Sequence, residues 1–356
     1  MEFRQAAAVN QPMSQSPPMA SIVIPVPPSM SCPLAIKELS KLDYPRDRYE
    51  VIVARGYQPS RQRNAAAREA TGEILLFLDD DSLVDANLLK TNTAYFSDES
   101  VACVGGPNIE ADEHGVTGRA INCVLASLFG DFRGCKRFAR RGHPRAVGED
   151  GLILCNVSVR RDIFDRIGGF PEQLYPNEEN AFFSKVTSIL KGSKLMYVPD
   201  AFVRRSRPST SKEFVRKVFG YGVGRLNQTF VRPTWVCAIR LLMGFFPLYW
   251  IAVPLISPRL AFLSLVVYAA GDALMAAKIF VGTRSVKVTE LSALLFPAMH
   301  LAYGCGILWG FLSKVLGLSR VRPGAIEVIH VKRFEDDEVN TDALAGSASN
   351  VHGAAV

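Results

Sequence analysis

The sequence predicts an α/β domain with a mostly parallel central sheet, followed by an α-helical membrane region. Two observations lead to this prediction. Between residues 21 and 230, short apolar runs rich in β-branched side chains alternate with segments of helical spacing, as in strands joined by helices. Between residues 231 and 316 the chain carries three long apolar stretches with almost no charge, and such stretches are typical of helices in a bilayer.

Three apolar runs predict the first strands of the sheet, at 21–26, 49–54 and 73–78. They are apolar at nearly every position, as expected for strands covered on both faces. Segments of helical spacing lie between them, at 33–42 and 60–71. Gly72 ends the second of these segments. Later in the domain we predict a helix at 178–191 and strands at 101–105, 152–159 and 194–203.

The three apolar stretches cover 241–256, 259–282 and 291–313. A membrane-spanning helix needs about 20 such residues, so we expect two to three spans, and the short first stretch could instead lie in the interface. The alternative is a set of buried helices in a soluble domain. A segment rich in Arg and Lys at 204–232 precedes the stretches, as is typical of a cytoplasmic face. We therefore expect the cytoplasmic (inner) membrane, with the α/β domain facing the cytoplasm.

Both ends of the chain are predicted to be disordered. Residues 1–20 lack a continuous apolar core, which also argues against a signal peptide. Residues 317–356 are expected to be largely disordered, because they become acidic and then rich in Ala, Ser and Gly. The last apolar stretch is followed by Lys314, Arg320, Arg322, Lys332 and Arg333. Three full spans would place these basic residues on the side opposite the cytoplasm. Either one segment is therefore interfacial, or the tail breaks the rule that basic residues next to spans lie on the cytoplasmic side.

The composition favours anionic partners and a reducing compartment. The formal net charge is +7, which suits an anionic membrane face, phosphorylated substrates or nucleic acid. The seven cysteines are odd in number and contain no Cys-x-x-Cys pair. This argues against a disulfide framework or a zinc site.

Three consecutive aspartates, Asp79 to Asp81, directly follow the apolar run 73–78. The carboxyl ends of parallel strands are where such sheets bind ligands. Like charges crowded there repel, and a hard cation such as Mg²⁺ or Mn²⁺, held by one or two carboxylates and substrate phosphates, removes the repulsion. The alternative is a solvated acidic turn or a helix N-cap.

Seven short motifs occur in an order and spacing that resembles glycosyltransferase family 2. They are SIVIPV (21–26), QRN (62–64), ATGEILLFLDDDS (70–82), VGGP (104–107), CNVSVRR (155–161), IGGFPE (167–172) and NEEN (177–180). The variants look like the bacterial exopolysaccharide branch, in which membrane helices follow the catalytic domain. The resemblance covers residues 21–225 and implies an inverting, metal-dependent enzyme with a Rossmann-like GT-A fold.

The resemblance also implies roles for single residues. Asp79 would face the nucleotide ribose, and Asp81 together with Asp79 would bind Mg²⁺ or Mn²⁺. Glu179 would be the general base, with Glu178 beside it; without the family, two acids in the first turn of a helix are explained by the helix dipole. The other residues expected at the donor are Asp80, Arg63, Asn64 and Pro25. Those expected near an acceptor or a phosphate are Arg160, Arg161, Arg204 and Arg205.

The sequence departs from the family pattern after the strand 49–54. Aspartates that contact the nucleotide base are replaced by the segment 55–60, and a helix and a strand before the QRN motif are missing. Base recognition could be rebuilt by Arg55, Tyr57 or Gln58, the donor could be unusual, or the site could be degenerate. The histidine often found before the basic segment is absent, and Arg204 and Arg205 stand nearest to its place. No Gln-x-x-Arg-Trp motif occurs, which argues against a polymer-extruding synthase.

Three functions remain open from the sequence. The first is transfer from a UDP- or GDP-type nucleotide-sugar to a hydroxyl of a lipid-linked saccharide, in exopolysaccharide or related glycan assembly. The second is transfer to a polyprenyl phosphate, and the third is a catalytically degenerate membrane scaffold. The expected partners are the donor, the lipid-linked or polyprenyl acceptor and the membrane, without nucleic acid.

Overall fold

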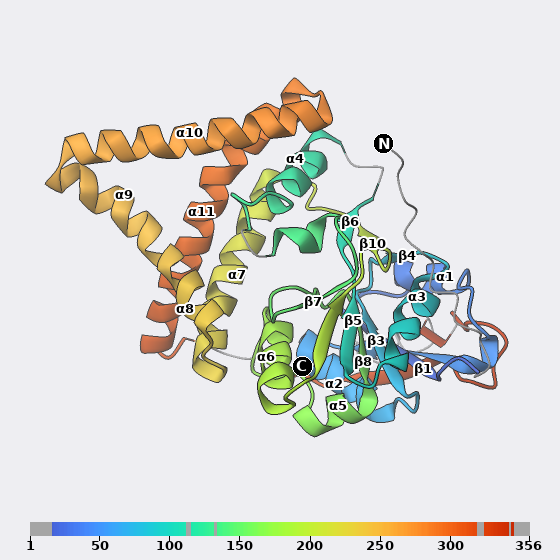
Figure 1. The fold of residues 1–356 in the computed structure, drawn as a ribbon. Coiled ribbons are helices and arrows are strands. Elements are labelled where there is room, and N and C mark those ends of the chain that lie inside the picture. The colour runs from blue at the N-terminus through green and yellow to red at the C-terminus, as the bar shows by residue number, and fades with distance from the viewer. Residues whose placement is uncertain (1–15, 112–114, 132–133, 319–323, 342, 345–356) are drawn as a thin grey trace.

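An eight-stranded mixed sheet organises the N-terminal part of the protein in the computed structural model (Figure 1). The structure describes residues 16–111, 115–131, 134–318, 324–341 and 343–344. The sheet order is β11-β2-β1-β3-β8-β5-β9-β7. These strands are β1 (Ala20–Val26), β2 (Tyr49–Arg55), β3 (Ile74–Leu78), β5 (Val101–Gly105), β7 (Arg145–Val147), β8 (Asn156–Arg160), β9 (Lys194–Tyr197) and β11 (Glu327–Lys332).

Strand direction decides which residues meet at one edge of this sheet. β1 is parallel to β2 and β3, whereas β8 runs antiparallel to β3, with Leu78 opposite Asn156 and Ile74 opposite Arg160. The carboxyl ends of β1, β2 and β3 therefore share an edge with the amino end of β8. This edge carries the three aspartates that follow β3.

A second, three-stranded sheet lies beside that edge and orders the segment after the aspartates. Its strands are β4 (Leu83–Val84), β6 (Asn108–Glu110) and β10 (Val203–Arg205), in the order β4-β10-β6. β10 pairs antiparallel with β4, and Arg204 lies opposite Leu83. The register thus brings the end of β10 next to the aspartate turn.

Helices cover both faces of the large sheet, as the continuous apolar strands predict. In β1, Ile22 and Ile24 face one apolar cluster and Val23 faces the other. The first cluster is completed by α1 (Leu34–Leu39) and α3 (Leu88–Ala94), the second by α2 (Pro59–Glu69), α5 (Arg161–Ile167) and α6 (Glu178–Ile189). Short 3₁₀ turns complete the connections: η1 (Arg46–Arg48), η2 (Tyr95–Ser97) and η3 (Cys135–Phe138).

The C-terminal part is helical and holds three segments that are long and apolar enough to cross a membrane: Trp235–Ile256, Pro258–Thr283 and Val286–Val315. The first comprises α8 (Trp235–Leu241), η4 (Leu242–Gly244) and α9 (Phe245–Ile256), and the others are α10 (Pro258–Thr283) and α11 (Val286–Val315). α9 and α10 project away from the sheet (Figure 1). The predicted fold class, an α/β domain followed by apolar helices, is confirmed.

α11 packs closely along α7 (Ser211–Val231), the long helix that leaves the α/β domain. A Cβ at Gly222 of α7 would lie 2.2 Å from the carbonyl oxygen of Tyr303, and one at Gly306 of α11 would lie 2.1 Å from that of Phe219. Only glycine permits this approach of two backbones. On its other side α11 contacts α4 (Val116–Leu125), where Ser292 donates a hydrogen bond to the carbonyl of Ala120 (3.4 Å).

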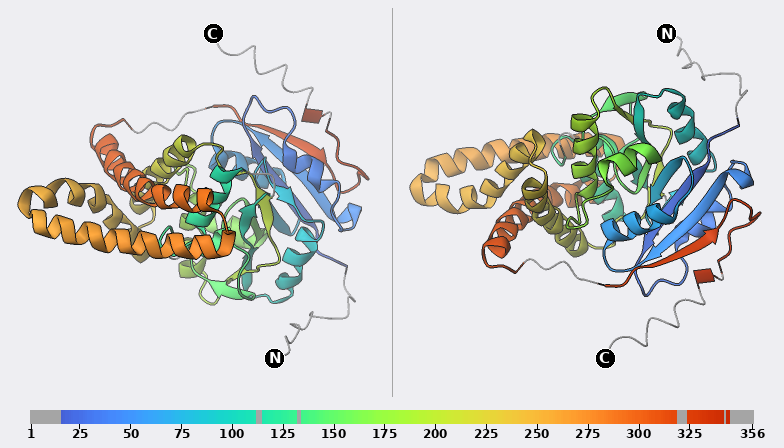
Figure 2. Two further views of the ribbon diagram at one scale, coloured as in Figure 1. Left: turned by 90° about the horizontal axis from the view of Figure 1, so that it is seen from above. Right: turned by 90° about the horizontal axis from the view of Figure 1, so that it is seen from below.

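Part of the C-terminal segment that the sequence predicted to be disordered is instead the edge strand β11. It pairs antiparallel with β2 and lies beside the N-terminal strands (Figure 2). An open edge of β2 would expose unpaired backbone groups, and β11 covers it while burying Val331 and Lys332. Ala20 already belongs to β1. Residues 1–15 and 345–356, also predicted to be disordered, lie outside the described residues, as do Arg320 and Arg322.

Candidate active site

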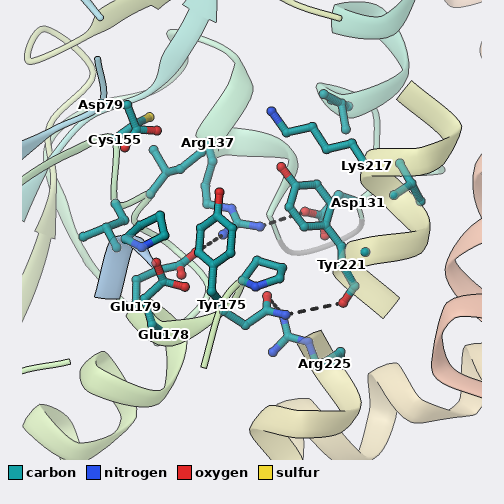
Figure 3. A pocket seen from close by; sticks show the side chains of 18 of the residues that line it. Asp79, Asp131, Arg137, Cys155, Tyr175, Glu178, Glu179, Lys217, Tyr221 and Arg225 are labelled. Carbon is teal, nitrogen blue, oxygen red and sulfur yellow. Dashed lines mark hydrogen bonds and ion pairs between the residues drawn. The ribbon is translucent and has the colours of Figure 1, made fainter. Parts of the chain in front are cut away.

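A cavity of about 870 Å³ opens where the aspartate edge of the sheet meets the helices. One side is formed by the ends of β1 and β3 and by the first turn of α6, and the other by α7, α8, η4 and α11. Figure 3 shows Asp79, Glu178 and Glu179 on one side of the hollow, with Lys217 and Tyr221 across from them. The cavity therefore joins a charged wall to a largely apolar one.

Asp79 is held by two guanidinium groups. The turn after β3 is fixed by Ser82, whose hydroxyl accepts a hydrogen bond from the Asp79 N–H (3.2 Å). Arg63 Nη2 lies 2.6 Å from Asp79 Oδ1, and Arg205 Nη1 lies 2.6 Å from Oδ2. Burial alone would raise the pKa of Asp79, but Arg205 and Arg63 together hold this pKa below its ordinary value. Asp79 is thus a fixed anion.

The next two aspartates differ from each other. Asp81 accepts a hydrogen bond at Oδ1 from Arg205 Nε (2.6 Å), so one guanidinium bridges Asp79 and Asp81. Asp80 lines the cavity. Burial raises the pKa of Asp80, and the charges of Asp81 and Asp79 raise it further.

Glu178 and Glu179 begin α6 on the same wall and have different partners. Glu178 is buried and accepts a hydrogen bond from Arg63 Nη1 (2.9 Å). Burial and the adjacent Glu179 raise the pKa of Glu178, which Arg63 only partly offsets. Glu179 lines the cavity, and Arg137 Nη1 is 4.0 Å from its Oε1. Glu179 is therefore the carboxylate with the looser ion pair and the more exposed side chain, 13% against 3% for Glu178.

A second buried ion-pair cluster links the cavity to the apolar helices, and no local sequence pattern indicates it. Asp131 lies 3.2 Å from Arg137 Nη2 and 2.9 Å from Arg240 Nη2, and Arg240 belongs to α8. Burial would raise the pKa of Asp131, but Arg240 and Arg137 hold this pKa below its ordinary value. Lys217 of α7 also lines the cavity, and among the described residues no hydrogen bond or ion pair engages it.

Most of the residues predicted for the site do meet in the cavity. The structure places seven of them in its lining: Pro25, Arg63, Asp79, Asp80, Glu178, Glu179 and Arg205. Asp81 is bound to Arg205 and is not itself a lining residue. Asn64, predicted at the donor, instead exchanges hydrogen bonds with the backbone of Phe170 (2.8 and 2.9 Å). Asn64 thus fixes the Gly-Gly-Phe turn and only indirectly positions Arg63.

Three predicted arginines do not line this cavity. Arg160 and Arg161 lie at the opposite edge of the sheet, because β8 is antiparallel, and both donate hydrogen bonds to backbone carbonyls there. Arg204 neighbours Arg205 on β10, but successive side chains of a strand point to opposite faces. Arg204 is exposed and stacks on Phe202 instead of entering the cavity.

The three residues proposed for base recognition at the end of β2 and after it, Arg55, Tyr57 and Gln58, have different surroundings. Arg55 is buried and lies 3.2 Å from Glu327 of β11. Gln58 caps α2, where it accepts a hydrogen bond from the N–H of Arg61 (3.1 Å). Tyr57 is the residue of this segment that faces the cavity with a largely exposed ring, 64% accessible. Of the three candidates for base recognition, Tyr57 alone lines the cavity.

The carboxylates expected to bind Mg²⁺ or Mn²⁺ are already engaged. Both oxygens of Asp79 and one of Asp81 face guanidinium groups. Within the described part of the chain, no group of three or more His, Cys, Asp or Glu side chains is placed to hold a metal ion. The donor set does not fit a resident cation while Arg205 stays in place, and the expected cofactor stays a prediction.

The Rossmann-like sheet, the acidic strand end and the acidic helix start define a glycosyltransferase of the GT-A fold class. Residues 39–219 match the sequence profile described as "Glycosyltransferase like family 2". The chain belongs to glycosyltransferase family 2, which confirms the resemblance seen in its motifs.

Two curated relatives are O-antigen chain rhamnosyltransferases of Salmonella. RfbN of Salmonella typhimurium is 27% identical over 165 residues, which are 45% of this chain and 49% of RfbN. WbaN of Salmonella anatum is 26% identical over 168 residues, which are 46% of this chain and 50% of WbaN. The chain thus matches about half the length of each relative.

A solved neighbour extends the fold comparison to most of the chain. The mannosyltransferase PcManGT from Pyrobaculum calidifontis, determined in complex with GDP-Man and Mn²⁺, is 16% identical with a TM-score of 0.50. The match covers 85% of this chain and 91% of PcManGT. At this identity the likeness establishes the shared fold alone.

Proposed function

We propose that this protein is a membrane-associated inverting glycosyltransferase that moves a sugar from a nucleotide-sugar to a hydroxyl of a lipid-linked saccharide. The observation that carries the proposal is the single cavity that runs from Asp79 and Glu179 to Met243 and Met299 of the apolar helices. A donor bound at the strand ends and a lipid-borne acceptor arriving along the helices would meet there.

The charged wall is suited to a UDP- or GDP-type donor. Asp79, fixed by Arg63 and Arg205, would accept hydrogen bonds from ribose hydroxyls at the lone pairs that the two guanidinium groups leave free. Tyr57 offers a ring on which a base can stack. Arg205 supplies positive charge for the diphosphate.

Glu179 is proposed as the general base. The acceptor hydroxyl attacks the anomeric carbon from the face opposite the diphosphate, so the new C–O bond forms as the bond to the phosphate oxygen breaks. Glu179 takes the hydroxyl proton, and the nucleoside diphosphate leaves with the bonding electron pair. Glu178 also lines the cavity but is a weaker candidate, because it is more deeply buried and bound to Arg63.

The helical wall is suited to the acceptor. It presents apolar side chains of α8, η4 and α11: Val236, Ile239, Met243, Met299 and Tyr303. Lys217 stands at its border and can face a phosphate of the carrier lipid. The basic α7 and the exposed apolar helices support a cytoplasmic face of the bacterial inner membrane as the place of action, and a role in exopolysaccharide or related glycan assembly.

Purified protein in detergent tests this function directly. Isothermal titration with UDP and GDP, each with EDTA and with Mn²⁺, reports donor binding and base preference. Binding of one nucleotide under at least one condition is expected. No binding under any condition would contradict the enzymatic function and leave a membrane scaffold.

A second candidate is transfer to a polyprenyl phosphate, which the position of Lys217 in the cavity favours. Such an acceptor is already an anion and needs cationic side chains more than a base. Radiolabelled product separates the two functions. Mild acid releases the sugar from a polyprenyl phosphate, whereas a glycosidic bond to a saccharide hydroxyl survives.

A further inference from the structure

Arg205 occupies the position between the two carboxylates of the Asp-x-Asp sequence. Its Nε lies 2.6 Å from Asp81 Oδ1 and its Nη1 lies 2.6 Å from Asp79 Oδ2. The pairing of β10 with β4 fixes this position, since Arg204 is opposite Leu83 and the next residue reaches the aspartate turn. The contact is therefore set by backbone register.

The surroundings of Arg205 stabilise a guanidinium there and oppose a second cation. Its side chain is 16% exposed, and that of Asp79 is 22% exposed. The other oxygen of Asp79 is taken by Arg63, which also holds Glu178. A divalent ion would have to displace two short charge-assisted contacts and then sit beside a displaced positive charge.

A guanidinium group can nevertheless bind a phosphate by itself. It has five N–H donors in a planar fork that matches phosphate oxygens, and it stays charged at all relevant pH values. Its two contacts with the aspartates leave donors for a ligand, and Arg205 lines the cavity. The aspartates would then hold Arg205 rigidly.

We propose that Arg205 takes the place of a divalent cation in this enzyme, so that it binds the diphosphate of the nucleotide-sugar without a metal ion. The proposal rests on the proposed function, since it concerns the same donor site. It assigns Asp81 a positioning role, through Arg205, in place of the metal-binding role expected from the sequence.

The test is nucleotide binding by the wild-type protein in detergent. Isothermal titration with UDP and GDP is run in EDTA and in Mn²⁺. We expect dissociation constants that agree within about threefold between the two conditions. Binding that needs Mn²⁺ would overturn the proposal while leaving the glycosyltransferase function intact, whereas an absence of binding in both conditions would overturn the function itself.

Two variants of neighbouring arginines sharpen the test. Arg205→Ala should weaken binding in EDTA by at least about 30-fold. Mn²⁺ should restore part of it, because the freed carboxylates of Asp79 and Asp81 can then hold the ion. Arg204→Ala is the matched control, as its side chain leaves the same strand on the outer face, and it should bind as the wild type does. Equal binding by Arg205→Ala and Arg204→Ala in EDTA would refute the proposal.

A measurement on the unmodified protein covers the case in which Arg205→Ala does not fold. The electron paramagnetic resonance signal of free Mn²⁺ is recorded with nucleotide alone and with nucleotide plus wild-type protein. We expect no further loss of signal when the protein is added. A loss that is stoichiometric with protein would show a bound ion and contradict the proposal.

Discussion

The two walls of the cavity are built in different ways. The charged wall consists of side chains at the ends of strands and at the start of α6, joined by ion pairs through Arg63 and Arg205. The helical wall combines apolar side chains with a few cationic ones such as Lys217 and Arg240, and its position depends on how α11 lies against α7. Disturbing one wall should therefore leave the chemistry of the other largely intact.

This difference separates donor functions from acceptor functions. The charged wall is fixed by the sheet, in which β1, β2, β3 and β5 are buried at every position. The helical wall is fixed by close backbone contact at two glycines and by the Arg240–Asp131 ion pair. Changes in the charged wall should therefore act on the rate of transfer or on donor affinity. Changes in the helical wall should act on binding and use of the acceptor.

Glu179→Gln should give the largest effect. The substitution keeps the shape of the side chain but removes the proton acceptor, so we expect sugar transfer to fall by about 10²–10⁴-fold. Nucleotide affinity should stay unchanged, because Glu179 holds neither Arg63 nor Arg205. Transfer rates and titration calorimetry on the same preparation check both halves. Normal transfer by this variant would sink the assignment of the base.

Gly306→Ala tests the helical wall. Its Cβ would lie 2.1 Å from the Phe219 carbonyl oxygen, so α11 must move away from α7. Overpacking of this kind costs about 1–3 kcal/mol. We expect a lower thermal midpoint in detergent and a raised KM for the lipid-linked acceptor, with unchanged nucleotide affinity.

The control for this variant is Gly282→Ala on the exposed α10, where an added Cβ meets no atom within 4 Å. It should behave as the wild type in all three measurements. If Gly306→Ala weakens nucleotide binding as much as acceptor use, the two walls are not separable.

Lys217→Ala should have a smaller effect at the border of the walls. Lys217 is exposed within the cavity, so the loss of one solvated charge near a phosphate should raise the KM of the anionic acceptor by about tenfold at most. The turnover number should stay the same. Lys212→Ala, which removes an exposed charge of α7 outside the cavity, provides the comparison.

Glu178→Gln should give the smallest effect, on the pH dependence of stability. Because the pKa of Glu178 is raised in the folded protein, the folded state binds more protons than the unfolded state above the ordinary glutamate pKa. Stability from this group is thus present at low pH and lost as pH rises toward the raised pKa. A glutamine at this position does not titrate. The thermal midpoint of the variant, taken relative to that of the wild type, should therefore rise as the pH increases from 5 to about 8. A constant difference across this range would contradict the raised pKa.

Local signals explain what the sequence could predict. The aspartates at the end of β3 and the glutamates at the start of α6 are adjacent to elements whose type is readable from apolar periodicity. Their placement in one cavity followed from the family motifs. The direction of β8 could not be predicted, since an antiparallel strand buried on both faces has the same apolar run as a parallel one. Because β8 is antiparallel, Arg160 and Arg161 lie at the edge of the sheet away from the aspartates.

Non-local contacts account for the remaining differences. Arg204 and Arg205 are equivalent in sequence, and only the pairing of β10 with β4 shows which one faces the aspartates. Asp131 meets Arg240 across more than a hundred positions of the chain. The strand β11 depends on the open edge of β2, which no local pattern reveals.

β11 also bears on how the chain threads a bilayer. A polypeptide that leaves the catalytic domain through α7 and rejoins its sheet at β11 must pass through any membrane an even number of times. The apolar stretch of α10 is 0% buried within the protein, and that of Trp235–Ile256 is 22% buried. The apolar stretch of α11 is 50% buried. We infer that α9 and α10 enter the membrane as a hairpin, while α8 and α11 stay with the catalytic domain. Lys332 and Arg333 then lie on the same side as the basic α7, and the charge asymmetry of the chain is consistent from end to end.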